Sequence, residues 1–464
     1  MLNSKSEKNS KNSPPKVFIR TFGCQMNQAE TDYMKDFMNF LGFSFTDNPN
    51  NADIVFVNTC TVREHAQNRG ISEIYKLKNW KEENPERILI MCGCVVENIG
   101  KEKLQKIFPF IDLFISSKET INLQNILFNF FKQNYKNFND EINKIGFSET
   151  FNNSTEIYSK LTSQSAVTKL VPVIFGCNNF CSYCIVPFVR GREFSRHPEE
   201  IITEIKNLVS NGIKEITLIG QNVNSYKYQL IKDEKLKIVD FADLLQAVNK
   251  IDGLLRIRFL TNHPKDMDDK LIDIIARTNK ICKHIHLPLQ SGSDRILKLM
   301  NRKYNRKQYF ELIDKIRNKI PEISITTDLM VGTPTETEMD FENTIDAVEK
   351  IQFDFSYVFK YSPRQGTKLY ELNDDVDLET KKKRHKILLD LCNKISMDKN
   401  SSFINNEIEI LVENIYNENS KYKIIGKTDN NRTVICTTDK PKLLGEIVKV
   451  KIIGKKIHSL IGEL

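Results

Sequence analysis

Short apolar runs alternate with longer amphipathic segments along the first 130 or so residues. Four such runs read as buried parallel strands: Val17–Ile19, Asp53–Val57, Ile88–Met91 and Asp112–Ile115. Helix-compatible segments separate them at about residues 30–41, 64–83 and 97–107. The pattern predicts a small open parallel α/β domain over residues 16–133, preceded by a disordered Asn-, Ser- and Lys-rich tail, residues 1–15.

A second α/β pattern follows a polar segment, residues 134–165, which is predicted to be a linker. Its six candidate strands are Val171–Phe175, Glu215–Ile219, Leu255–Leu260, His284–Leu289, Ser324–Val331 and Asp354–Tyr361. Helical stretches alternate with them at 198–210, 266–278, 306–319 and 337–350. Six β-α repeats predict a partial (β/α)6 barrel over residues 166–395.

The last part of the chain changes character after a basic helix near residues 379–399. Short β-rich runs separated by turn residues follow at Glu407–Val412, Lys421–Gly426, Thr433–Thr437 and Glu446–Gly454. They predict a small all-β barrel over residues 396–464, with 11 basic against 9 acidic residues, so this domain is not strongly basic. The fold class is therefore α/β, with an all-β domain at the carboxyl end.

Composition and charge narrow the class of protein only modestly. Hydrophobic residues make up 40% and charged residues 28% of the 464 residues, which excludes a fully disordered chain. The net charge of +8 permits a nucleic-acid partner without requiring one. No apolar run approaches the roughly 18 residues of a membrane span, and the start has no signal-peptide core. We therefore expect a cytoplasmic protein with no membrane partner.

Three of the ten cysteines stand within eight residues: Cys177, Cys181 and Cys184, here called the barrel set. They follow the first predicted barrel strand. Three thiolates at this spacing suit an iron–sulfur cluster in which one iron stays open for a substrate. The alternative is a zinc knuckle that takes a distant fourth ligand, for which His197 is the candidate.

Three further cysteines each follow a predicted strand of the first domain: Cys24, Cys60 and Cys94, here called the N-terminal set. Because the carboxyl ends of parallel strands meet at one edge of a sheet, these thiols can converge on a second cluster. The residues alone leave Cys92 competing with Cys94. The remaining cysteines, Cys282, Cys392 and Cys436, lack partners in the pattern and are predicted to pack in the core.

The CxxxCxxC spacing of the barrel set resembles the signature of radical S-adenosylmethionine enzymes. Three segments, 21–27, 58–64 and 92–94, resemble the amino-terminal domain of the radical methylthiotransferases, in whose motif the Cys after Gly favours Cys94 as the ligand. Segments 176–193, 218–226 and 287–293 resemble the branch that makes 2-methylthio-N6-isopentenyladenosine in tRNA, and residues 396–464 resemble a TRAM domain.

The resemblance implies two 4Fe-4S clusters, one on each cysteine set, and S-adenosylmethionine as cofactor and radical source. The implied reaction replaces the hydrogen on carbon 2 of a tRNA adenosine by a methylthio group. That hydrogen is neither acidic nor on an electrophilic carbon, which explains the need for a radical. Sister branches act on threonylcarbamoyl-adenosine or on a ribosomal-protein aspartate, and a zinc-stabilised RNA-binding protein is the alternative without catalysis.

Further residues are weaker candidates for contacts with S-adenosylmethionine. They are Tyr183, Gly220, Gln221, Asn222, Asp328 and Gly332. Tyr183 can instead pack, and the run 220–222 can be a plain turn. Asp328 and Gly332 lie at the end of the fifth predicted strand, where a barrel places its site. Asn27 and Glu30 can mark a site or only a helix start.

The predicted RNA partner is the anticodon loop of tRNA, whose single-stranded bases can be splayed out and stacked. The basic run Lys381–Arg384, and Arg302 with Lys303 and Tyr304, are candidates to track its phosphates, although most such runs are solvated faces. An electron donor and a sulfur source are also required, and their identities do not follow from the sequence.

Overall fold

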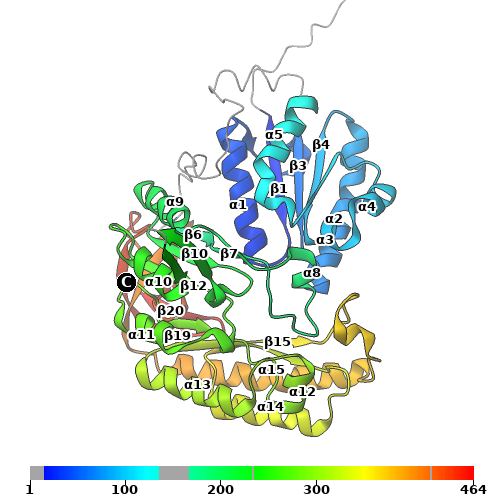
Figure 1. The fold of residues 1–464 in the computed structure, drawn as a ribbon. Helices are drawn as coiled ribbons and strands as arrows, with labels where there is room; N and C mark the ends of the chain where they lie inside the picture. The colour runs from blue at the N-terminus through cyan, green and yellow to red at the C-terminus, as the bar shows by residue number, and fades with distance from the viewer. Residues whose placement is uncertain (1–14, 135–166, 233–234, 419–420) are drawn as a thin grey trace, which may run out of the picture. The chain divides into compact units, whose positions relative to one another are not determined.

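The computed structural model describes residues 15–134, 167–232, 235–418 and 421–464. The chain divides into two compact units, Met1–Leu161 and Thr162–Leu464 (Figure 1). The predicted tail and linker fall almost entirely outside the described residues and stay predictions. In the described ranges, no helix is long and apolar enough to cross a membrane.

The first unit is built on a five-stranded sheet in which every strand pair is parallel, as predicted. Its strands, in spatial order, are β2 (Ser44–Phe45), β1 (Lys16–Thr21), β3 (Ile54–Thr59), β4 (Ile88–Gly93) and β5 (Leu113–Ser116). The central strands β3 and β4 are buried at every position, which explains their uninterrupted apolar runs.

Helices cover both faces of this sheet (Figure 1). One face packs against α1 (Gln25–Phe40) and α5 (Leu123–Asn134), and the other against α2 (Glu64–Glu83), α3 (Cys94–Ile99) and α4 (Lys101–Ile107). Helix α1 begins at Gln25, earlier than the predicted 30, because Cys24 occupies its N-cap position. The predicted helix 97–107 is divided at Gly100, whose φ of +89° interrupts it, and α5 was not predicted.

Six parallel strands of the second unit confirm the predicted partial barrel. One sheet holds β6 (Thr168–Pro172), β9 (Glu215–Ile219) and β12 (Arg256–Phe259), and the other β13 (His284–His286), β14 (Ser324–Val331) and β15 (Phe355–Lys360). A parallel bridge between Ile257 and Ile281 joins the two sheets. The surrounding helices are α9 (Pro198–Ser210), α10 (Phe241–Asn249), α11 (Asp269–Arg277), α12 (Asp294–Leu299), α13 (Arg306–Lys319) and α14 (Glu338–Ile351).

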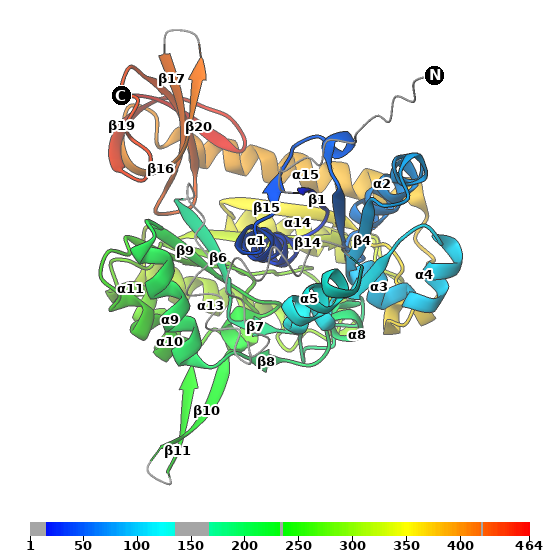
Figure 2. The same ribbon diagram turned by 90° about the horizontal axis from the view of Figure 1, so that it is seen from above.

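Several elements of this unit differ from the prediction. The predicted strand 171–175 is divided into β6 and β7 (Ile174–Phe175), and β7 pairs with β8 (Phe194–Ser195). The short helix α8 (Val186–Arg190) lies between β7 and β8 along the chain. A hairpin of β10 (Lys227–Lys232) and β11 (Lys235–Asp240) projects from the barrel (Figure 2). Helices α10 and α12 were also not predicted.

The carboxyl end of the second unit is a closed barrel of β16 (Glu407–Glu418), β17 (Lys421–Thr428), β18 (Thr433–Thr438), β20 (Ser459–Glu463) and β19 (Ile447–Lys455), as predicted except for β20. The 24-residue helix α15 (Leu378–Ser401) leads into it. Arg256 donates to the Lys427 carbonyl at 2.6 Å, and Arg258 to the carbonyls of Thr428 and Asp429 at 2.6 and 3.0 Å. Buried arginines thus fasten the small barrel to the parallel one.

Candidate functional site

The barrel set lies in a loop that follows β7 and folds back on itself. Gly176, just before Cys177, has a φ of +70°, and a Cβ there would meet the Arg192 carbonyl oxygen at 2.1 Å. The Cys177 N–H donates to the Gly191 carbonyl at 3.1 Å, and the Cys184 N–H to the Cys181 carbonyl at 2.9 Å. Only glycine permits this close backbone approach, which makes the loop compact.

Burial shapes the chemistry of these thiols. Burial first, and then the charge of the nearby Cys181, raise the pKa of Cys177 to about 11 and that of Cys184 to about 12. Three thiols in one compact, partly buried loop repel one another once ionised. Such a donor set fits a cationic iron cluster, which favours the thiolate form.

Arg302 occupies a place that the sequence did not indicate. Its Nη1 donates to the Cys181 Sγ at 3.3 Å, its Nε to the Tyr304 hydroxyl at 2.9 Å and its Nη2 to the Pro288 carbonyl at 3.0 Å. Both Arg302 and Tyr304 are buried, so the prediction that they track RNA phosphates is wrong. Among the described residues, no carboxylate forms an ion pair with this guanidinium, and a buried unpaired charge calls for an anion.

Three buried polar atoms near the carboxyl ends of β9 and β12 have no hydrogen-bond partner among the described residues. They are Asn222 Oδ1, Asn262 Oδ1 and His263 Nε2, on side chains no more than 4% exposed. The Nδ1 of His263 accepts from the Lys265 N–H at 3.2 Å, so the proton of the neutral ring lies on Nε2. Burial and the charge of Arg302 lower the pKa of His263 to about 2. Unsatisfied donors and acceptors of this kind fit a polar ligand.

The other residues predicted to contact a cofactor lie on or beside strand ends and in the cysteine loop. Half-buried Tyr183 lies between two cysteines of the barrel set, and burial and Cys181 raise its pKa. Gly220 packs tightly on β7, where a Cβ would meet the Ile174 side chain at 2.2 Å, and Gln221 follows it half-buried. Asp328 Oδ1 lies 3.5 Å from His286 Nε2 on the neighbouring strand.

Gly332 follows β14 with a φ of +72°. Its N–H donates to Glu336 Oε1 at 2.9 Å. Gly220 and Asn222 thus lie just beyond β9 and Gly332 just beyond β14, whereas Asp328 lies within β14 and not at its end as predicted. The sequence alone missed Asn262 and His263, for which the polar run Thr261–Asn262–His263 after an apolar strand was the available signal.

In the first unit, the N-terminal set gathers at one edge of the sheet. The adjacent strands β1, β3 and β4 end in register, with Thr21 beside Asn58 and Thr59 beside Gly93. A Cβ at Gly23 would meet the Cys60 Cβ at 2.5 Å, and one at Gly93 the Thr59 carbonyl oxygen at 2.2 Å. The glycines before Cys24 and Cys94 therefore pack directly against the end of β3 and Cys60, which follows it.

Asn27 connects these strand ends. Its amide donates to Asn58 Oδ1 at 3.0 Å and to the Thr59 carbonyl at 3.1 Å, while the Cys24 thiol donates to its Oδ1 at 3.3 Å. Since α1 already begins at Gln25, the interpretation of Asn27 as a helix cap is wrong. Asn27 instead holds Cys24 against the end of β3.

Cys92 and Cys94 have different surroundings. Cys92 lies in the hydrophobic core between the sheet, α1 and α5, and burial followed by the charge of Glu30 raises its pKa well above the ordinary value. Cys94 begins α3 directly beyond the end of β4. Cys282, Cys392 and Cys436 are buried, as expected for core residues, and all ten cysteines are free of disulfides.

Nowhere in the described part of the chain do three His, Cys, Asp or Glu side chains converge on a single metal ion. The ligands of a four-iron cube stand farther apart, since each thiolate binds a different iron. His197, the candidate fourth zinc ligand, instead caps α9, where its Nδ1 accepts from the Glu199 N–H at 3.2 Å. In this structure His197 therefore acts as a helix cap.

Known protein families match three parts of the chain. Residues 16–116 match uncharacterized protein family UPF0004, residues 171–348 the Radical SAM superfamily and residues 402–464 the TRAM domain. The fold and the two cysteine sets thus define the class as radical S-adenosylmethionine enzymes with an added TRAM domain.

Two similar relatives are tRNA-2-methylthio-N(6)-dimethylallyladenosine synthases. The chain is 41% identical to that of Caldicellulosiruptor saccharolyticus over 456 residues, 98% of this chain and 93% of that protein. It is 41% identical to that of Clostridium botulinum (strain Loch Maree) over 453 residues, 97% of each. The chain belongs to the tRNA-2-methylthio-N(6)-dimethylallyladenosine synthase family and is a radical S-adenosylmethionine methylthiotransferase.

A solved structure shares the fold at low sequence identity. A radical S-adenosylmethionine methyltransferase of Kitasatospora setae superposes with a TM-score of 0.51 at 12% identity, covering 77% of each chain. This likeness concerns the fold alone.

Proposed function

We propose that this chain replaces the hydrogen on carbon 2 of N6-isopentenyladenosine (dimethylallyladenosine), next to the tRNA anticodon, by a methylthio group. One observation carries the proposal: the first unit has a cysteine beyond each of three adjacent parallel strands and the second has three in the loop after β7, in a chain 41% identical to a synthase over 98% of its length. Both cysteine sets are complete.

The barrel set is proposed to hold one 4Fe-4S cluster, and the N-terminal set the other. Cys94 rather than Cys92 is the third ligand of the second cluster, because Cys92 is enclosed in the apolar core. When bound, the first cluster supplies the electron that cleaves S-adenosylmethionine, and the second supplies the sulfur that is inserted.

The polar groups near the barrel set suit the amino-acid end of S-adenosylmethionine. The buried guanidinium of Arg302 and the Nε2–H of His263 are donors for its carboxylate. The Oδ1 atoms of Asn222 and Asn262 are acceptors for its ammonium group. Tyr183, Gly220, Gln221, Asp328 and Gly332 are the proposed contacts for the remainder of the cofactor.

The TRAM barrel is the proposed tRNA contact. The outward-facing positions of β19 include the exposed side chains of Lys449 and Lys451, which can meet phosphates. The anticodon loop presents carbon 2 without any need to open a helix. An electron donor and a sulfur source are further partners, and the ten free cysteines support a reducing, cytoplasmic location.

Nucleoside mass spectrometry tests the proposal. Anaerobically reconstituted protein, S-adenosylmethionine and a reductant are incubated separately with isopentenylated tRNA, threonylcarbamoylated tRNA and ribosomal protein. A methylthio mass gain on isopentenyladenosine alone is expected. A gain only on another substrate would move the chain to a sister branch. No gain, with both clusters intact, would contradict the assigned acceptor.

Metal content separates this function from a zinc-stabilised RNA-binding protein. Anaerobically purified protein is expected to be brown and to carry about eight irons. A colourless protein with stoichiometric zinc would refute a radical reaction.

A further inference from the structure

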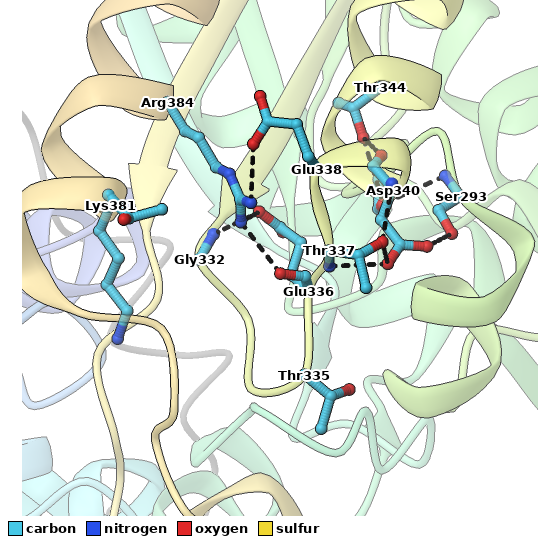
Figure 3. Close-up of polar contacts among 12 residues, drawn as sticks. Ser293, Gly332, Thr335, Glu336, Thr337, Glu338, Asp340, Thr344, Lys381 and Arg384 are labelled. Atoms are coloured by element: carbon cyan, nitrogen blue, oxygen red, sulfur yellow. Dashed lines mark hydrogen bonds and ion pairs between the residues drawn. The ribbon is translucent and has the colours of Figure 1, made fainter.

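The loop between β14 and α14, residues 332–337, is held by the start of helix α15 (Figure 3). Gly332, the first residue of this loop, has a φ of +72°, and a Cβ there would meet the Lys381 Cγ at 2.3 Å. The Lys381 side chain is itself fixed, since its Nζ forms an ion pair with Asp374 at 2.6 Å. The backbone of the loop and the aliphatic part of Lys381 are thus packed in contact.

One carboxylate joins this glycine to α15. Oε1 of Glu336 accepts from the Gly332 N–H at 2.9 Å and from Arg384 Nη1 at 2.9 Å. The same guanidinium nitrogen donates to the Glu336 carbonyl at 3.1 Å. Glu336 is 8% exposed and Arg384 6% exposed, so water competes little with these bonds.

The other end of the loop is fixed by a separate network (Figure 3). Asp340 accepts from the Thr337 N–H at 2.9 Å and from the Ser293 hydroxyl at 2.5 Å. Arg295 donates to Asp340 and to Thr335. Because this end has its own anchors, loss of Arg384 would free the Gly332 end without releasing the whole loop.

We propose that Arg384 is a positioning residue that fixes Gly332 and the loop behind it in the conformation that binds S-adenosylmethionine. It acts through Glu336 and does not touch the cofactor itself. This inference rests on the proposed function, in which Gly332 lines the cofactor site. The basic run 381–384 then has two kinds of residue. Lys381 and Arg384 are buried and hold the loop, whereas Lys382 and Lys383 are exposed.

The prediction from sequence alone was that this whole run tracks RNA phosphates. For Lys381 and Arg384 the structure contradicts it, because both cations are buried and bonded to acidic groups of the protein. Lys382 and Lys383 remain accessible to RNA. Exposed Lys382 is therefore a matched control for buried Arg384.

The experiment compares Arg384→Met, Arg384→Lys and the control Lys382→Met. Affinity for S-adenosylmethionine is measured by calorimetry on cluster-loaded protein, and affinity for tRNA by filter binding. Amide hydrogen exchange of peptide 332–337 is followed in the metal-free protein. Arg384→Met is expected to weaken S-adenosylmethionine binding about tenfold or more, the effect of losing hydrogen bonds to a buried carboxylate.

Exchange of the loop amides is expected to accelerate in Arg384→Met, with tRNA affinity unchanged. Arg384→Lys keeps the charge but not the paired bonds, and should lie between the wild type and Arg384→Met. Lys382→Met should leave both exchange and S-adenosylmethionine affinity as in the wild type. If Arg384→Met does not fold, the loop exchange and S-adenosylmethionine affinity of Arg384→Lys are the test.

Unchanged exchange and unchanged S-adenosylmethionine affinity in the Arg384 variants would overturn the inference, as would a loss of tRNA affinity without a loss of cofactor affinity. Failure of the proposed function would give a different set of results from failure of this inference. There the wild type itself would not methylthiolate isopentenylated tRNA, while the comparison of cofactor affinities between variants would still give a result.

Discussion

The Nη1 atom of Arg302 lies 3.3 Å from the Sγ of Cys181, the middle cysteine of the barrel set. Burial would by itself disfavour the charge of this guanidinium, but Tyr304, Tyr183 and Cys181 raise its pKa above an already high ordinary value. A permanent positive charge therefore adjoins one proposed cluster ligand.

We expect Arg302→Met to lower the midpoint potential of the barrel-set cluster by tens of millivolts. The positive charge favours the reduced, more negative cluster, and 59 mV corresponds to tenfold in a one-electron equilibrium. A redox titration followed by electron paramagnetic resonance measures the shift. Arg302→Lys, which keeps the charge, should shift the potential less. Equal shifts in the two variants would mean that packing rather than charge matters.

Loss of a cysteine from the barrel set should affect activity differently from loss of one from the N-terminal set. Cys177→Ala should abolish cleavage of S-adenosylmethionine, whereas Cys24→Ala should leave some cleavage but no methylthiolation. Each variant should lose about four of about eight irons. Liquid chromatography of cleavage products, nucleoside mass spectrometry and iron analysis check these outcomes. Normal methylthiolation by Cys24→Ala would disprove the assignment of the N-terminal set.

Cys92 and Cys94 provide a matched pair, two residues apart. Cys92→Ala should keep about eight irons and cost roughly 1 kcal/mol of unfolding free energy, because it removes a small buried side chain from the core. Cys94→Ala should lose about four irons. Iron analysis and denaturant unfolding distinguish them. Loss of iron in the Cys92 variant instead would reverse the assignment.

His263 should contribute a single hydrogen bond to the cofactor. His263→Phe removes the Nε2–H and should weaken S-adenosylmethionine binding roughly tenfold, as expected for a buried donor to a charged group. His263→Gln places an amide N–H at a similar distance from the backbone and should recover much of the affinity. Calorimetry with loaded protein is the measurement. Equal affinities in the two variants would exclude a role for the donor.

The same histidine makes stability depend on pH. Its pKa is lowered to about 2 in the folded chain from an ordinary 6.5, so below pH 6.5 the unfolded chain binds a proton that the folded chain does not. Its contribution to stability is therefore present above pH 6.5 and falls by about 1.4 kcal/mol for each pH unit below it.

At pH 5, the wild type should have lost about 2 kcal/mol more unfolding free energy, relative to pH 7, than His263→Gln. Denaturant unfolding of the metal-free protein at both pH values provides the comparison. Parallel losses in the two proteins would show that His263 is protonated in the folded state.

Most of the proposed cluster ligands were predictable from the sequence because their pattern is local. The barrel set lies within one short loop, and its spacing alone indicates an open cluster. The N-terminal set was predictable for a related reason. Each of its cysteines follows an apolar run, and parallel strands necessarily end at one edge of a sheet, as β1, β3 and β4 do.

The short and half-polar elements were not predictable to the same degree. Strand β20 and helix α12 are too short for periodicity to identify, and the β10–β11 hairpin mixes lysines with apolar residues without a clear alternation. Helix α1 begins earlier than expected because Cys24 occupies its N-cap position, and Asn27 in its first turn instead bonds the end of β3. Tertiary hydrogen bonds here override local capping preference.

The sequence by itself determined the fold class and the order of the longer apolar strands, since these follow from periodicity. Spacing along the chain indicated five of the six proposed cluster ligands, and the family resemblance favoured Cys94 over Cys92 as the sixth. Only the tertiary structure decided which charged side chains are buried and which are exposed. Arg302 and Arg384 look like surface cations in the sequence, yet one adjoins Cys181 and the other bonds Glu336 in the interior. Whether a charged side chain meets water or a buried partner depends on residues distant in the chain, which only folding brings beside it.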